Sequence, residues 1–136
     1  MLSIFVEASC NRYNRDECVD CHVFEPLADI PKSDWHMTPD QAHLMAEKIG
    51  KVDVLHALAQ QEINLTGGEA IQNPYIVEIF EIFQTVAPYV CLHTNLEMNS
   101  KSSKKWLRLV EIVKKGGRAD ITLYPTAWEK YQKPLL

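Results

Sequence analysis

Three of the four cysteines lie close together near the start of the chain, in the stretch "VEASCNRYNRDECVDCH" (residues 6–22). Thiols at such spacings close disulfides, bind zinc, attach a haem through Cys18-x-x-Cys21-His22, or hold an iron–sulfur cluster. For zinc, a complete Cys3His set is available, made of Cys10, Cys18, Cys21 and His22. The three cysteines alone do not distinguish these four kinds of site, so the rest of the sequence is needed to choose among them.

Composition indicates one globular domain. The chain has 136 residues, of which 46% are hydrophobic and 24% are charged, and this length suffices for a substantial core. The net charge of −4 provides no basic surface for nucleic acid, so we expect no nucleic-acid partner.

The expected cellular compartment argues against two of the four kinds of site. No apolar run approaches the roughly 20 residues that a membrane span needs, and the opening "MLSIFVEA" lacks a basic region and carries Glu7. We therefore expect a cytoplasmic protein without membrane contact, in which thiols stay reduced. Disulfides are then disfavoured, and so is covalent haem attachment, which is typical of exported proteins.

Short apolar segments alternate with helical patterns along the chain. A polar, proline-containing loop (residues 9–37) separates the first strand from a helix with Thr38 as N-cap, Pro39 at its first position and Gln41 completing a capping box. An apolar stripe that includes Met45 and ends at Val52 predicts the buried side of this helix. Two more helices are expected, over residues 73–86 and 102–117. Strands are expected over residues 2–8, 62–68, 88–95 and 119–125.

This alternation predicts the α/β class with a parallel sheet. In parallel sheets the functional groups gather at the carboxyl ends of the strands. Each expected strand ends in residues that are unusual for a core. These are Cys10 after the first, Gly67-Gly68-Glu69 after the second, Thr94-Asn95 after the third, and Tyr124 at the fourth.

Three of these strand ends together resemble the radical S-adenosylmethionine (radical SAM) superfamily. A cysteine triad follows the first strand, "INLTGGEAIQNP" is similar to the family's second-strand GGE motif, and "LHTNLE" is similar to its third-strand TNG motif. The GGE phrase with its following NP is the most specific of the three. The resemblance implies a partial or full (β/α) barrel.

By this resemblance, Cys10, Cys18 and Cys21 bind a [4Fe–4S] cluster and S-adenosylmethionine occupies the fourth iron. Three thiolates leave one of four irons open, whereas four would close the cluster. The turn Gly67-Gly68-Glu69 would receive the methionine end of the cofactor, since glycines allow close backbone approach and Glu69 offers a carboxylate. The family also implies a flavodoxin-like or ferredoxin-like reductant. Asn95 and Tyr124 are expected to contact the ribose or the substrate.

The sequence departs from the family pattern at several points. The first cysteine gap is C-x7-C rather than C-x3-C, Asp20 occupies a position that is usually aromatic (Phe24 lies nearby), and Ala70 replaces a proline. The four βα units are fewer than the six of a partial barrel, so residues 1–136 are expected to form an incomplete core domain. We expect a fragment, half of a split enzyme, or a domain that a partner chain or self-association completes. The alternative is a non-enzymatic half-barrel subunit with a structural zinc or iron–sulfur site.

The remaining candidate ligands have simpler explanations. Cys91 lies between Val90 and Leu92 in an expected strand, which favours a buried core thiol over a fourth cluster ligand. The other histidines are scattered along the chain and are expected to be structural or solvated. They are His36, His43, His56 and His93.

Overall fold

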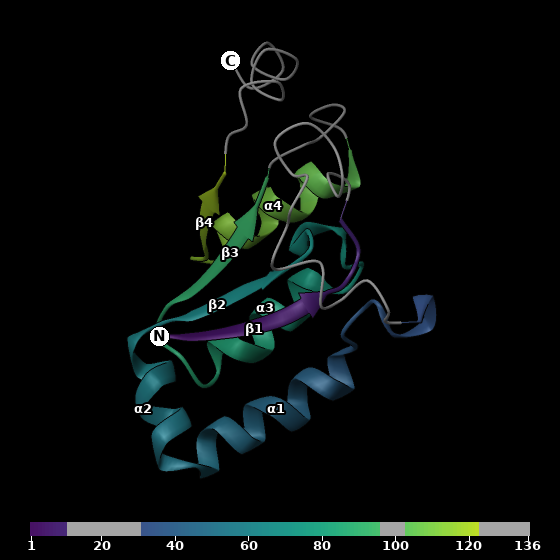
Figure 1. Cartoon of the computed structure of the whole chain (residues 1–136). Coiled ribbons are helices and arrows are strands. Elements are labelled where there is room, and N and C mark those ends of the chain that lie inside the picture. The colour runs from purple at the N-terminus through teal and green to yellow at the C-terminus, as the bar shows by residue number, and fades with distance from the viewer. Residues whose placement is uncertain (11–30, 96–102, 123–136) are drawn as a thin grey trace.

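Four parallel strands form one sheet in the computed structural model, which describes residues 1–10, 31–95 and 103–122 (Figure 1). The strands are β1 (Leu2–Glu7), β2 (Ile63–Gly67), β3 (Val90–Thr94) and β4 (Arg118–Ile121). The α-helices of the described residues are α1 (Pro39–Lys51), α2 (Asp53–Gln61), α3 (Ile76–Gln84) and α4 (Lys104–Lys114). Two short 3-10 helices are η2 (Lys32–Asp34) and η3 (Ala70–Gln72).

The strands follow one another across the sheet in sequence order, and every neighbouring pair is parallel. A helix separates each strand from the next, as βαβ crossovers require. The predicted α/β class and parallel sheet are therefore confirmed. Because the strands point the same way, the carboxyl ends of β1, β2 and β3 lie along one edge of the sheet (Figure 1).

One face of the sheet and the helices enclose the apolar core. Alternate residues of a strand point to opposite faces, and one set of alternating residues in β1, β2 and β3 is buried with helix side chains. The strand members of this core are Ile4, Val6, Ile63, Leu65, Val90 and Leu92. The helix members include Ala46, Ile49, Ala59, Ile79, Phe80, Phe83, Leu109 and Ile112.

The opposite face carries polar side chains at its centre. The register pairs Asn64 with Cys91, Cys91 with Arg118, and His93 with Asp120. Residues paired in a parallel register project from the same side, so these five side chains share one surface. We call this group, Asn64, Cys91, His93, Arg118 and Asp120, the polar face.

The first predicted helix begins as expected but ends earlier. The Thr38 side chain accepts a hydrogen bond from the Gln41 backbone, and the Gln41 side chain accepts one from the Thr38 backbone, so the capping box is confirmed. The stripe prediction was wrong for Met45 and Val52, which are 36% and 43% exposed. Val52 lies at the break between α1 and α2, where the chain changes direction. Helix α2 was not predicted as a separate element.

Asn73 ties the turn before α3 to the first strand. Its side chain is fully buried, and its Nδ2 donates to the carbonyl of Val6 (2.6 Å) and to that of Met37 (3.0 Å). Its Oδ1 accepts from the backbone N–H of Tyr75 (2.8 Å). One amide thereby fixes the end of β1 and the segment before α1 against the connection from β2 to α3.

Candidate functional site

Backbone hydrogen bonds join the end of β1 to the turn after β2. The N–H of Gly68 donates to the carbonyl of Glu7 (2.9 Å), and the N–H of Glu69 donates to the carbonyl of Ser9 (2.8 Å). The ladder between the two strands therefore continues past their ends. It places Cys10 directly beside the Gly67-Gly68-Glu69 turn.

Both glycines of this turn are required by close packing against β1 and the residues that follow it. Gly67 has φ +148°, which disfavours residues with a side chain, and a Cβ there would lie 2.1 Å from the Glu7 carbonyl oxygen. A Cβ on Gly68 would lie 2.3 Å from the Ser9 carbonyl oxygen and 3.0 Å from the Cβ of Cys10. The glycine pair thus sets how near the turn comes to Cys10.

Glu69 links the turn to the end of β3 through its carboxylate. Its Oε1 accepts a hydrogen bond from the Thr94 hydroxyl (2.6 Å), and its Oε2 accepts one from the Asn95 backbone N–H (2.8 Å). The Ile71 N–H is a weaker donor to Oε1, at 3.4 Å. The residue is 2% exposed, and this burial raises the pKa of its carboxyl, although the three donors act in the opposite direction.

The predicted site residues that the structure describes come together at one end of the sheet. Cys10, the Gly67-Gly68-Glu69 turn and Asn95 follow three adjacent strands and are connected by the hydrogen bonds above. Cys10 is half-buried and faces Gly68. Cys18, Cys21 and Tyr124 lie outside the described residues.

Two contacts near Cys10 were not predicted from the sequence. The buried carboxylate of Glu7 is 2.6 Å from His36 Nδ1 and also accepts from the Ser9 backbone N–H (2.8 Å). The Ser9 hydroxyl donates to the side-chain oxygen of Gln72 (3.0 Å). These contacts hold the backbone that leads to Cys10. The partners are 29 and 63 residues apart, so only the tertiary structure reveals them.

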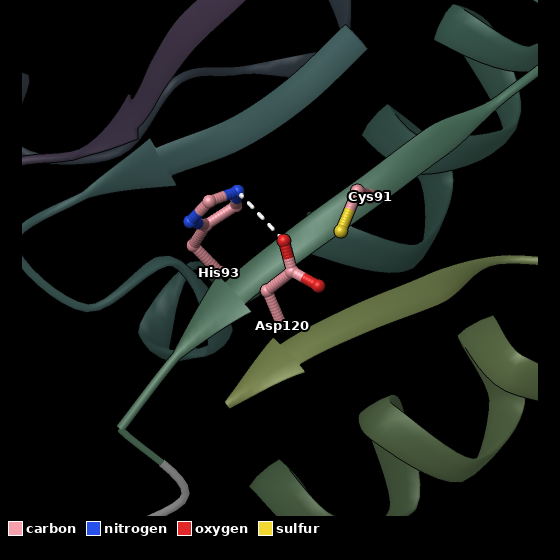
Figure 2. A group of neighbouring side chains, drawn as sticks. All are labelled: Cys91, His93 and Asp120. Atoms are coloured by element: carbon pink, nitrogen blue, oxygen red, sulfur yellow. Dashed lines mark ion pairs between the residues drawn. The ribbon is translucent and has the colours of Figure 1, made fainter. Parts of the chain in front are cut away.

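A second group of ligand-type side chains lies on the polar face. Cys91 and His93 project from β3 and Asp120 projects from β4, and the three point toward one another (Figure 2). His93 Nε2 is 3.5 Å from Asp120 Oδ2. One donor atom from each residue lies within 4.8 Å of the other two, so these side chains form a candidate metal-ligand group within the described residues.

Cys91 is buried as predicted, but away from the apolar core. Cys91 is fully buried from solvent. Its position in the register places its side chain on the polar face beside Asp120. Burial, followed by the nearby Asp120 carboxylate, raises the pKa of the Cys91 thiol to about 11. The alternation Cys91-x-His93 already indicated that both side chains share one strand face; the approach of Asp120 depends on the pairing of β3 with β4.

Searches for related proteins identify no family for the chain. No protein-family model, curated protein or solved structure matches the chain. Within the described ranges, no helix has the length and apolar character to cross a membrane.

Proposed function

We propose that this chain is a radical SAM core domain, or part of one, which binds a [4Fe–4S] cluster and S-adenosylmethionine at the carboxyl ends of its strands. The observation that supports this most is the junction of Cys10 with the Gly67-Gly68-Glu69 turn. A thiol and a glycine–glycine–glutamate turn from separate strands, 57 positions apart in sequence, are held together by two backbone hydrogen bonds. The parallel sheet is compatible with a partial (β/α) barrel of four βα units.

The donor set fits an iron–sulfur cluster. Cys10, which follows β1, would supply one thiolate, and Cys18 and Cys21 would supply two more. Three thiolates satisfy three irons of a cubane cluster and leave the fourth open to an exogenous ligand. When bound and reduced, the cluster with S-adenosylmethionine on its open iron would supply a 5′-deoxyadenosyl radical for hydrogen abstraction.

The remaining residues of the site would position the cofactor. Glu69 accepts its described hydrogen bonds from Thr94 of β3, from Asn95 just after β3 and from Ile71 of η3, and so fixes the turn against the end of β3. Its carboxyl is buried, and a cation beside the turn would offset the cost of ionising it. The methionine ammonium group of the cofactor is such a cation. We therefore assign Glu69 to positioning, together with electrostatic support of that ammonium group.

The proposal extends to the partners that such a core needs. A flavodoxin-like or ferredoxin-like protein would deliver the electron, and further strands from a partner chain or a second copy would extend the barrel beyond β4. An active site closed in this way excludes water from a reactive radical. We assign the protein to the cytoplasm, where free thiols persist.

Anaerobic reconstitution tests the proposal directly. With iron and sulfide, the full chain should yield a brown protein with four irons per chain, as a cubane cluster requires. Cys10→Ser should abolish the cluster, whereas the matched variant Cys91→Ser should retain it. With dithionite and S-adenosylmethionine, the reconstituted chain, supplied with candidate partner chains, should release 5′-deoxyadenosine.

Two results would contradict the proposal. A colourless protein that takes up zinc through Cys10 and no iron–sulfur cluster would replace it with a structural zinc site. A cluster that is never accompanied by cofactor cleavage, with dithionite and every partner chain supplied, would favour the non-enzymatic half-barrel subunit.

A further inference from the structure

The polar face presents three metal-ligand side chains at a spacing suited to one ion. The Cys91 sulfur, a His93 ring nitrogen and an Asp120 carboxylate oxygen all lie within 4.8 Å of one another. Two ligand atoms each about 2.0 Å from a zinc ion lie about 3.3 Å apart at the tetrahedral angle. His93 Nε2 and Asp120 Oδ2, at 3.5 Å, are already near that separation.

The sheet itself creates this arrangement. Cys91 and His93 are two residues apart on β3, so strand alternation projects both from the same face. Asp120 is the register partner of His93 on β4. All three ligands therefore rise from regular, hydrogen-bonded strands, which position side chains more accurately than loops do.

An unsatisfied polar atom next to this group is an independent sign of a missing ligand. Asn64 is 2% exposed, and its Oδ1 accepts no hydrogen bond from any residue in the described ranges. A buried acceptor without a donor is costly, and native structures contain few of them. Asn64 is the register partner of Cys91 and belongs to the same polar face. A metal-bound water on this face would supply the donor.

We propose that Cys91, His93 and Asp120 bind a zinc ion, with water as its fourth ligand and Asn64 as an acceptor on the same face for that water. Thiolate, imidazole and carboxylate are the three ligand types that zinc takes in proteins, and the thiolate excludes magnesium and calcium. Zinc would balance the two negative charges of Cys91 and Asp120. Three protein ligands plus water are typical of zinc sites that keep one position exchangeable.

The exposure of the ligands leaves a route for the ion. Cys91 is inaccessible, but the side chains of His93 and Asp120 are 44% and 57% exposed. Arg118, the register partner of Cys91 on β4, donates to Glu62 at 2.9 Å. Its charge is thereby partly balanced, which reduces its competition with a metal ion for Asp120.

Cobalt binding to a chain with one cysteine tests this site without interference from the cluster loop. In the full-length Cys10→Ser, Cys18→Ser, Cys21→Ser variant, Cys91 is the single remaining thiol of four. Titration with Co²⁺ should give one equivalent bound, a thiolate-to-cobalt charge-transfer band, and the intense visible bands of four-coordinate cobalt. Zn²⁺ should displace the cobalt and remove these bands.

Single substitutions identify the ligands. Adding Cys91→Ser should eliminate the charge-transfer band, and His93→Ala or Asp120→Asn should weaken binding by about tenfold or more. The matched control His43→Ala removes an exposed histidine of α1 and should change nothing. Absence of the charge-transfer band, or unchanged affinity in His93→Ala, would overturn the proposal.

A second measurement covers the case in which the triple serine variant does not fold. The full native chain and its Cys91→Ser variant are then compared after zinc saturation, and the native chain should hold one more equivalent. Equal zinc contents would contradict the site. This outcome is independent of the proposed cluster, which Cys91 does not ligate, so the two proposals fail separately.

Discussion

The carboxylate of Glu69 accepts a 2.6 Å hydrogen bond from the hydroxyl of Thr94, and this contact joins the ends of β2 and β3 in the interior of the protein. The same carboxylate accepts from the backbone of Asn95. On the other side of the turn, the N–H of Glu69 donates to Ser9, next to Cys10. One residue thus connects all three strand ends of the candidate site.

Glu69→Gln should change how stability depends on pH. The folded-state pKa of Glu69 is raised, so its contribution to stability is full below the ordinary carboxyl pKa of 4.5 and is lost as pH rises through the folded-state value. The native chain should therefore gain stability relative to Glu69→Gln on acidification. Urea unfolding of both proteins at a series of pH values measures this difference.

A surface carboxylate provides the control for this experiment. Glu78→Gln removes an exposed charge in the first turn of α3, and its difference from the native chain should vary little over the same pH range. A Glu69→Gln curve that runs parallel to the native curve would show that the Glu69 carboxyl is not desolvated.

Gly68→Ala should destabilise the fold and disturb the position of Cys10. The added Cβ would lie 2.3 Å from the Ser9 carbonyl oxygen, and this backbone atom cannot move aside without disturbing the hydrogen bond that it accepts from the Glu69 N–H. Overpacking of this kind costs about 1–3 kcal/mol. Denaturant unfolding measures the loss, and reconstituted iron content reports on Cys10.

Gly50→Ala is the matched glycine substitution. Gly50 lies within α1, and a Cβ added there would meet no atom within 4 Å. Alanine is better than glycine in a helix by about 0.5–1 kcal/mol, so this variant should gain stability. Equal losses in the two variants would show that close packing at Gly68 is not the cause.

Asn73→Ala should be among the most destabilising polar substitutions in the described chain. Its buried amide donates to the carbonyls of Val6 and Met37, and both would lose this donor. The Val6 carbonyl keeps a second donor, the Met37 N–H at 3.1 Å, but the Met37 carbonyl and the Tyr75 N–H lose their partner in the Asn73 side chain. An unsatisfied buried group costs about 1–3 kcal/mol, so a loss of about 2 kcal/mol is expected in urea unfolding. Gln60→Ala removes an exposed side-chain donor to Val86 and should stay within about 0.5 kcal/mol.

Local sequence signals predicted the four strands and three of the four α-helices of the described residues, but not helix α2 or the junctions between elements. The Thr38–Gln41 capping box and the apolar strand segments are short-range patterns, and both appear where expected. The sequence does not predict the break between α1 and α2, because the apolar stripe of α1 continues to Val52 in the sequence. Asp53 in the first turn of α2 was the available signal of a new helix start.

For the candidate site too, some contacts could be predicted from the sequence and others could not. The rule that parallel strands gather functional residues at their carboxyl ends correctly placed Cys10 near Glu69. It could not reveal that the Glu69 carboxylate is engaged by β3, because that depends on rotamers and burial. The rule also could not predict that His93 and Asp120 are neighbours, because this depends on the register of β3 and β4. A shift of one residue in that register would place the two side chains on opposite faces.

The Cys91 thiol should titrate well above an ordinary cysteine in the metal-free protein. Its pKa is raised to about 11, first by burial and then by the Asp120 carboxylate. In the chain whose other three cysteines are serine, the ultraviolet thiolate absorbance should therefore rise only as the pH approaches this value, once the absorbance of the same chain with Cys91→Ser is subtracted to remove the signal of the five tyrosines. The same chain in urea should titrate near the unperturbed 9.0.

Asp120→Asn separates the two causes of this shift. Removing the carboxylate charge should lower the Cys91 pKa, yet leave it above 9.0 because desolvation is the larger cause. The raised pKa also lowers the stability of the folded chain as pH rises from about 9 toward 11, since the unfolded thiol ionises first. An Asp120→Asn variant with an unchanged Cys91 titration would show that the two side chains do not interact, and would remove the electrostatic basis for their sharing one cation.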